Sequence, residues 1–442
     1  MKKAHVYLGL GLAVFCSACT APSLRYKNEI SKMSAQGEFK TAADVIEQKR
    51  TKLYAKQDRA LAYLDEAVLL HDAGETAKSD ELFAQAQDRL EELYTVSVTK
   101  SAGRLVVNDL TSPYSVAPYE RAMTYFYRAM NFLDQNNLID AAVEARRAVM
   151  FLDNLRGSKT KGYNDDPFVQ YFASLVFESA GQIDDARISR TNALEGYRRL
   201  RDKLHVQTPE FSVPANYNEL GEVIIFHYNG LLPLKRNTTV QFAWDKVYAM
   251  LSTSQESRYG EVSPEVANAL RAGFLGNAVT LAYPVLVDQP YVITSSFVQT
   301  IDGQTYKMQK MADLSAAAKA DLEERLPGIW FRAASSAVAK QVAASSTRQA
   351  VKSAVNEKNQ VWGDVAGLFV TVVGSAVEKA DTRQWFTLPA QIFMTRLFLP
   401  PGEQDIDLFF RDGFGNIVEK HTFEKVRLTP GGRVFLHYRT AK

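Results

Sequence analysis

The side chains of this 442-residue chain that could perform chemistry are few and widely spaced. None of the histidines has the paired spacing of a zinc motif such as HExxH. The chain also has neither the GxSxG turn of serine hydrolases nor a glycine-rich phosphate loop. The histidines are His5, His71, His205, His227, His421 and His437. We therefore predict no catalytic residue, no metal site and no cofactor, and expect a protein that is not an enzyme.

Cys19 is the residue whose context most clearly predicts a chemical modification. Residues 1–18 have a basic start, a short apolar centre and small residues at their end, the order of a bacterial lipoprotein signal peptide. The cysteine that follows such a signal receives the lipid, so Cys19 is the predicted lipidation site. Cys16 fits less well because bulky Phe15 precedes it. The alternative is cleavage to a soluble secreted protein.

The residues around Cys19 also predict a location. Thr20 rather than aspartate follows it, and by resemblance to the sorting of Gram-negative lipoproteins we expect an outer-membrane anchor facing the periplasm. Both cysteines lie in this segment, so the mature chain can form no internal disulfide. The formal net charge is +2 without a long basic run, so nucleic acid is not an expected partner.

The first half of the chain must position any site, and a helical pattern recurs in it three times. In the clearest copy, large apolar side chains at helical spacing lead to a turn at Asn136, and small residues follow on the second helix. Gly74 and Gly181 occupy the turn position in the other copies, and Gly37 in a partial earlier one; glycine and asparagine tolerate the left-handed conformation that ends a helix. We predict a tetratricopeptide-like domain over residues 19–204. The alternative is an ordinary helical bundle.

In this register the concave wall of the repeats is almost entirely apolar, and Phe126 and Met130 are its candidate partner contacts. The wall consists of Leu61, Leu64, Val68, Met123, Phe126, Met130, Leu133, Phe168, Tyr171 and Leu175. Soluble proteins seldom leave such a surface uncovered. We expect the chain's own insertion or C-terminal half to fill it, because a lipoprotein crosses the periplasm before it meets a partner. A partner helix is the alternative.

Two other places in the helical half could contact a partner. Residues 95–120 interrupt the repeats and read as a long loop, which either lines a site or, as we favour, packs over the groove. Its candidate contacts are Asn108, Asp109, Tyr114, Tyr119 and Glu120. Arg146 and Arg147 could hold an anion, but acidic residues at helical distance favour a solvated salt-bridge surface.

After a proline-marked linker the chain changes to short β-branched runs separated by turn residues. The strand candidates are 222–228, 278–287, 291–300, 391–399, 405–411, 417–423 and 433–438. We predict a C-terminal α/β domain over residues 205–442 built on an antiparallel sheet or sandwich, which makes the whole chain an α+β protein.

Residues 314–380 interrupt these strands with Ala- and Gly-rich helices. Pro327-Gly328 is expected to divide the first helix. The second, at 361–380, has small residues at every fourth position, which lets two backbones approach closely. Membrane insertion is one interpretation of that helix, but its apolar centre is short for a span, so we favour a soluble helical hairpin.

Asp381, Arg383 and Trp385 bring an acid, a base and an aromatic ring to the return from this hairpin to the sheet. Such a group could bind a sugar or a peptide, or it could fasten the hairpin to the sheet. We favour fastening, because polar residues at junctions often cap helix ends.

Together these segments resemble a family of uncharacterised Gram-negative lipoproteins with tetratricopeptide-like N-terminal halves, often encoded beside an activator lipoprotein of penicillin-binding proteins. The resemblance is carried by Cys19 with its signal and by YERAMTYFYRAMNFL, DAAVEARRA, DPFVQYFASLVFESAGQIDDARI, EVIIFHYNGLLPLKR and ADTRQWFTLPA. It implies a role in the cell envelope and carries over no catalytic residue.

The sequence thus predicts a non-enzymatic, outer-membrane-anchored scaffold whose repeats bind an envelope protein. The alternative is an envelope enzyme, or a glycan- or peptidoglycan-binding protein, that uses the 95–120 loop and the 381–385 junction.

Overall fold

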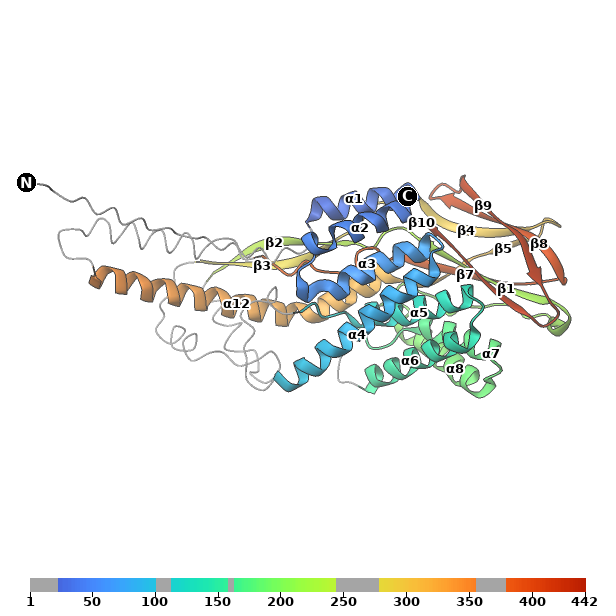
Figure 1. The fold of residues 1–442 in the computed structure, drawn as a ribbon, viewed down its shortest axis with the longest axis horizontal. Coiled ribbons are helices and arrows are strands. Elements are labelled where there is room, and N and C mark those ends of the chain that lie inside the picture. Colours follow the sequence, from blue (N-terminus) through green and yellow to red (C-terminus); the bar gives the residue numbers. More distant parts are fainter. Residues whose placement is uncertain (1–22, 101–112, 158–162, 244–277, 355–378) are drawn as a thin grey trace, which may run out of the picture.

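The computed structural model describes residues 23–100, 113–157, 163–243, 278–354 and 379–442. It shows an α+β protein in which paired helices precede β sheets, with one long helix inserted between strands (Figure 1). The helices of the first half are α1 (Leu24–Ala35), α2 (Phe39–Leu53), α3 (Arg59–Asp72), α4 (Thr76–Lys100), α5 (Pro118–Asp134), α6 (Leu138–Gly157), α7 (Pro167–Ser179) and α8 (Ile183–Leu200). The second half contains β1 (Gly221–Asn229), β2 (Leu234–Ala243), β3 (Ala278–Val287), β4 (Ile293–Thr300), β5 (Thr305–Lys307), β6 (Gln309–Asp313), α12 (Leu314–Ala354), β7 (Gln391–Leu399), β8 (Gly402–Asp412), β9 (Ile417–Leu428) and β10 (Arg433–Thr440).

The four helix pairs are closed by the same turn. Gly37, Gly74, Asn136 and Gly181 have φ values of 77°, 80°, 56° and 73°. In each turn the next amide bonds to the carbonyl five residues before it, as Glu75 does to Leu70 at 2.8 Å. This is the Schellman arrangement, which a residue in the left-handed conformation makes possible. The predicted pairing of the helices and its turn positions are therefore confirmed.

The predicted loop at 95–120 is shorter in the structure, because α4 continues as a helix to Lys100. At the other end of the segment α5 begins at Pro118, whose missing amide hydrogen costs nothing at the first helical position. Asn108 and Asp109 lie outside the described residues.

The central sheet has the strand order β10-β1-β7-β6, and all nine residues of β1 are buried. Strand β1 pairs with β7 in the antiparallel sense but with β10 in the parallel sense. The prediction of an antiparallel sheet is thus wrong for β1 and β10, while the other described strand pairs are antiparallel. Strand β10 can be parallel because it arrives from the far end of the chain rather than through a hairpin.

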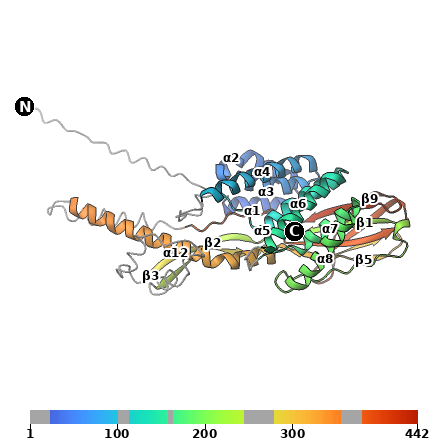
Figure 2. The ribbon, with the colours of Figure 1, turned by 90° about the horizontal axis from the view of Figure 1, so that it is seen from below.

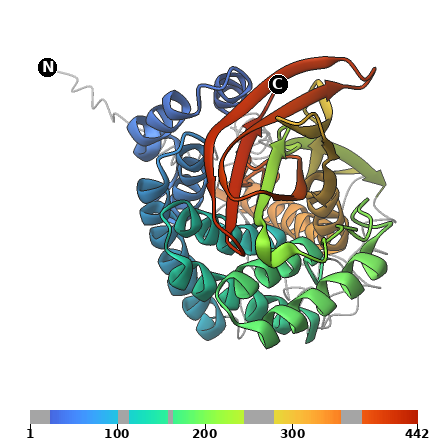
Figure 3. The same cartoon turned by 90° about the vertical axis from the view of Figure 1, so that its right-hand side faces the viewer.

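The helices curve around one face of this sheet, and the sheet fills the helical groove (Figure 3). Phe126 of α5 contacts Phe226 and Tyr228 of β1, with ring centroids 5.9 and 6.0 Å apart. Phe172 of α7 contacts Phe435 of β10 at 6.5 Å. One continuous core contains residues of both halves. The expectation that the C-terminal half covers the apolar wall is confirmed.

The opposite face of the central sheet packs on a second sheet of order β5-β4-β8-β9. Along β1, Ile224 and Phe226 face the helices, whereas Val223 and Ile225 enter the core against the second sheet. A strand buried on both sides must be apolar at successive positions, which explains its unbroken β-branched and aromatic run.

Helix α12 and the hairpin of β2 and β3 project from this body (Figure 2). The predicted break at Pro327 is wrong, because α12 runs through it for 41 residues. Both Pro327 and Glu323 are exposed, so water can bond to the Glu323 carbonyl that the proline leaves without an amide donor. The predicted second helix lies outside the described residues apart from its last two. Within the described ranges no helix is long and apolar enough to cross a membrane.

Candidate functional site

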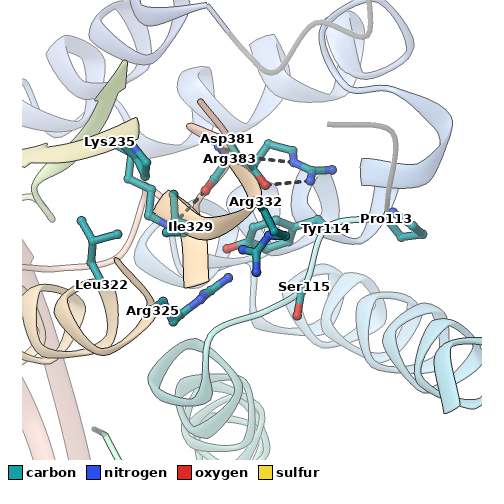
Figure 4. Close-up of a pocket in the computed structure, with 11 residues that line it drawn as sticks. Pro113, Tyr114, Ser115, Lys235, Leu322, Arg325, Ile329, Arg332, Asp381 and Arg383 are labelled. Carbon is teal, nitrogen blue, oxygen red and sulfur yellow. Dashed lines mark hydrogen bonds and ion pairs between the residues drawn. The ribbon is translucent and has the colours of Figure 1, made fainter. Parts of the chain in front are cut away.

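A pocket of about 210 Å³ lies where four segments that are distant in sequence meet (Figure 4). They are the segment before α5, the antiparallel pair of β2 and β3, residues 322–332 of α12, and the segment before β7. The lining residues are Pro113, Tyr114, Ser115, Lys235, Pro284, Leu322, Arg325, Ile329, Arg332, Asp381 and Arg383. The predicted loop and the predicted junction are therefore brought together at one site.

The pocket lining carries more positive than negative charge. Lys235, Arg325, Arg332 and Arg383 are basic, and Asp381 is the acidic member. Arg325 bonds to Asp321 at 3.2 Å on its own helix, yet 43% of its side chain remains exposed. It can therefore turn toward a ligand without leaving a buried position. Arginine presents several N–H donors in a fork that matches carboxylate and phosphate groups.

Arg383 has a structural role as well as a place in the pocket wall. Its guanidinium bonds to Asp58 and Asp381, both at 2.7 Å, and only 3% of the side chain is exposed. Burial alone would raise the pKa of Asp381, but the bonds from Arg383 lower it. A carboxylate held in this way is a weak base, so Asp381 is suited to orienting Arg383 rather than to accepting protons.

Lys235 lies beside this pair on β2. Its amide donates to Gln384 Oε1 at 2.7 Å, and its Nζ donates to the Arg383 carbonyl at 3.3 Å. Burial lowers the pKa of the Lys235 ammonium, against the opposing attraction of Glu120. An anion entering the pocket would favour the charged lysine, so ligand and lysine would stabilise each other.

Glu120 bonds to Tyr114, a residue of the pocket lining. It is fully buried and accepts from the Ala117 amide at 2.9 Å, from the Tyr114 hydroxyl and from the Trp385 amide at 3.0 Å. Glutamate at the third helical position is a sequence signal for capping the start of a helix. Here the same carboxylate also holds the junction.

A second buried pair ties the junction to the first helices. Lys27 of α1 donates to the Thr382 carbonyl at 2.8 Å. Asp65 of α3 accepts from Thr387 at 3.1 Å and from Tyr54 at 2.9 Å. Burial raises the pKa of Asp65 to about 7 and lowers that of Lys27 to about 8, while each opposes the other's shift. These contacts attach the junction to α1 and α3. The predicted fastening of the helical hairpin to the sheet stays a prediction, because most of the hairpin's second helix lies outside the described residues.

The residues proposed from sequence as partner contacts lie in three different environments. Tyr114, Asp381 and Arg383 line the pocket. Tyr119, Glu120, Phe126, Met130 and Trp385 pack inside the protein, each no more than 2% exposed. They are buried because the sheet and the junction occupy the groove, so they do not face a partner. Arg147 pairs with Glu144 three residues away on α6, as the salt-bridge interpretation predicts. Arg146 pairs instead with Asp185 of α8, not with an acidic residue of its own helix. Cys19 lies outside the described residues.

Sequence reasoning missed Lys235, Arg325 and Arg332. The two arginines are seven residues apart, two helical turns, and so share one face of α12. The sequence shows this spacing. It does not show that this face of α12 lies beside a strand and two loops.

The pocket lining offers several arginine and lysine donors, the groups that hold carboxylates and phosphates in proteins. Comparisons of the chain with protein-family models, with curated proteins and with solved structures give no match. Function is therefore inferred from the pocket and from the sequence.

Proposed function

We propose that this chain is a non-enzymatic, lipid-anchored outer-membrane protein in which tetratricopeptide-like helices and β sheets frame a pocket for an anionic ligand of the cell envelope. The observation that carries the proposal is the meeting of residues 113–115 with Asp381 and Arg383 around basic side chains. The repeated helical turns support the repeat assignment. The signal-like residues 1–18 before Cys19 support the anchor.

The ligand class follows from the lining. Arginine and lysine in the lining favour a carboxylate or a phosphate, and a pocket of about 210 Å³ admits a terminal group rather than a folded partner. Among the anions of the bacterial envelope, the peptide stems of peptidoglycan present carboxylates on flexible chains. We therefore propose carboxylate-bearing peptidoglycan fragments as the ligand.

The test measures binding of purified peptidoglycan fragments to the soluble mature chain. Arg325→Gln removes an accessible cation from the pocket and should weaken binding about tenfold, because a hydrogen bond to a charged group contributes about 1.5–3 kcal/mol. The matched control is Arg187→Gln on α8, whose side chain is 71% exposed and remote from the pocket lining. Equal affinities of the two variants, or no binding by the wild type, would contradict the proposal.

The outer surface of α6 supports a second function, binding of an envelope protein. Ile139, Val143 and Met150 are 79%, 49% and 60% exposed and share one helical face with Arg146. Neighbouring exposed apolar side chains of this kind often mark interaction surfaces. A pull-down from envelope extract with Val143→Asp should lose a protein that Arg325→Gln retains. If both variants retain the same proteins, α6 is not the interaction surface.

A further inference from the structure

Two histidines and an aspartate meet where the central sheet enters the helical groove. His71 lies on α3, Asp134 at the end of α5 and His437 on β10. One potential ligand atom from each lies within 4.8 Å of the others. The two imidazole rings are stacked, with centroids 4.2 Å apart and an interplanar angle of 18°. The three residues come together only because the two halves of the chain share one core.

The hydrogen bonds of His71 leave one of its nitrogens with an unused lone pair. Its Nδ1 donates to Asn131 Oδ1 at 2.6 Å. The orientation of Asn131 is fixed in turn, because its Nδ2 donates to Ser79 Oγ at 2.9 Å. Nε2 is therefore the acceptor nitrogen, and it is buried without a hydrogen-bond partner.

This is the state in which histidine binds metals. A metal-ligating imidazole is neutral and usually donates its other N–H to a fixed acceptor, which orients the ring. An unpartnered polar atom in a buried position is otherwise costly and calls for an explanation such as a bound ion.

The other two groups close the cluster on its solvent side. His437 Nε2 donates to Asp134 Oδ2 at 3.0 Å, and the two side chains are 16% and 20% exposed. A solute can therefore reach them from outside, whereas His71 is fully buried. In a tetrahedral site with bonds of about 2.0–2.1 Å, ligand atoms are about 3.3 Å apart. His437 Nε2 and Asp134 Oδ2 already have a spacing near this, whereas His71, with one ligand atom within 4.8 Å, must come closer to share an ion with them.

One ion pair lies close to the cluster. Asp72 and Arg439 are buried nearby with Oδ2 and Nε 3.6 Å apart, and the metal must bind against the positive charge of Arg439. The Asp134 carboxylate would supply the negative charge among the three proposed ligands. The Tyr228 ring stacks on His437 at 5.5 Å and brings no charge.

We propose that His71 Nε2, His437 Nε2 and the Asp134 carboxylate bind one divalent transition metal of the zinc type, with water as the fourth ligand. Two imidazoles and one carboxylate suit zinc and its neighbours, whereas magnesium and calcium prefer oxygen ligands alone. The His437 ring must turn out of its stack so that the lone pairs of His71 Nε2 and His437 Nε2 point at the same ion.

On binding, the metal replaces the proton on His437 Nε2, and that proton passes to solvent. The bound ion joins α3, α5 and β10 and locks the sheet in the groove, independently of any ligand in the pocket.

Isothermal titration of the untagged, EDTA-treated mature chain with zinc chloride tests the site, with magnesium chloride in parallel. We expect one zinc ion per chain, no magnesium binding, and release of about one proton, read from buffers of different ionisation enthalpy. His437→Phe removes the ligand nitrogen but keeps an aromatic ring in the stack. Asp134→Asn removes the charge but keeps the shape of the side chain. Each variant should weaken zinc binding at least about tenfold. The control is His421→Phe on β9, because His421 also stacks on a ring, that of Tyr438, at 4.0 Å.

Thermal melting with and without zinc separates loss of the site from loss of the fold. Zinc should raise the melting temperature of the wild type and of His421→Phe, and should raise that of His437→Phe and Asp134→Asn less. Absence of zinc binding, or equal zinc binding by all four proteins, would overturn the proposal. If one variant fails to fold, the other decides.

Discussion

The backbone amide of Trp385 donates to Glu120 Oε1 at 3.0 Å, and this bond joins two segments 265 residues apart. Glu120 thereby caps α5 and holds the segment that leads into β7. Trp385 itself is fully buried and contacts the Phe83 and Tyr127 rings, with centroids 5.8 and 6.2 Å away. The pocket wall formed by Asp381 and Arg383 is therefore fixed to the helical half.

Replacing Glu120 should loosen this attachment. Glu120→Gln keeps the side-chain shape but removes the charge that strengthens its bonds to Ala117 and Trp385. The free energy of unfolding should fall by about 1–3 kcal/mol, measured by chemical denaturation. Glu81→Gln, at an exposed position on α4, is the control and should unfold like the wild type. A Glu120→Gln protein as stable as this control would show that the carboxylate does not hold the junction.

Asp65 should make stability fall as the pH rises from acidic to neutral. Its pKa is raised by burial from 3.8 to about 7, so between these values the folded protein holds a proton that the unfolded chain has lost. Its contribution to stability is fully present below about pH 4 and is lost as the pH rises through about 7. The loss is at most about 4 kcal/mol.

Asp65→Asn should therefore flatten the dependence of stability on pH across this window. Asp72 and Asp166, whose pKa values burial raises to about 6, act in the same direction in both proteins, so the difference in slope isolates Asp65. Melting of wild type, Asp65→Asn and the exposed control Asp184→Asn from about pH 4.5 to about pH 7.5 measures it. Parallel curves for all three would exclude a proton on Asp65 in the folded state.

The helical half alone should expose its apolar wall. In the fragment Ala21–Asp202, side chains such as Phe126 and Phe172 lose the β1 and β10 rings that cover them. We expect the fragment to aggregate or to bind a hydrophobic dye, and the full mature chain to do neither. A monomeric, dye-negative fragment would mean that the repeats are self-contained.

Cys19→Ser should abolish fatty-acid labelling and release the protein from the outer-membrane fraction, because serine offers no thiol for the lipid. Cys16→Ser is the matched control and should remain labelled and membrane-bound. If the Cys19→Ser protein is still labelled and still fractionates with the outer membrane, Cys19 is not the anchor.

The sequence was sufficient to predict the features that depend on local backbone conformation. A residue able to adopt positive φ must end the first helix of each pair, so Gly37, Gly74, Asn136 and Gly181 marked the turns. The apolar concave wall of the helices also implied that another part of the chain covers it. Strands β1 and β10 pack against it. The identity of that cover required the pairing of strands from opposite ends of the C-terminal half, which no local pattern encodes.

The candidate site was only partly predictable for the same reason. Tyr114, Asp381 and Arg383 stood out because they interrupt regular elements, whereas Arg325 belongs to a helix whose surroundings depend on the whole fold. His71 and His437 have no motif spacing, so only the docking of β10 into the helical groove reveals their contact.

The most direct measurement of the proposed function compares two forms of one ligand on the wild-type mature chain. A peptidoglycan stem fragment with free carboxylates and the same fragment with its carboxylates amidated are titrated at low and at high salt. We predict that amidation weakens binding about tenfold and that salt weakens binding of the free acid more than that of the amide. Equal affinity for the two forms at both salt concentrations would contradict an anion-binding pocket.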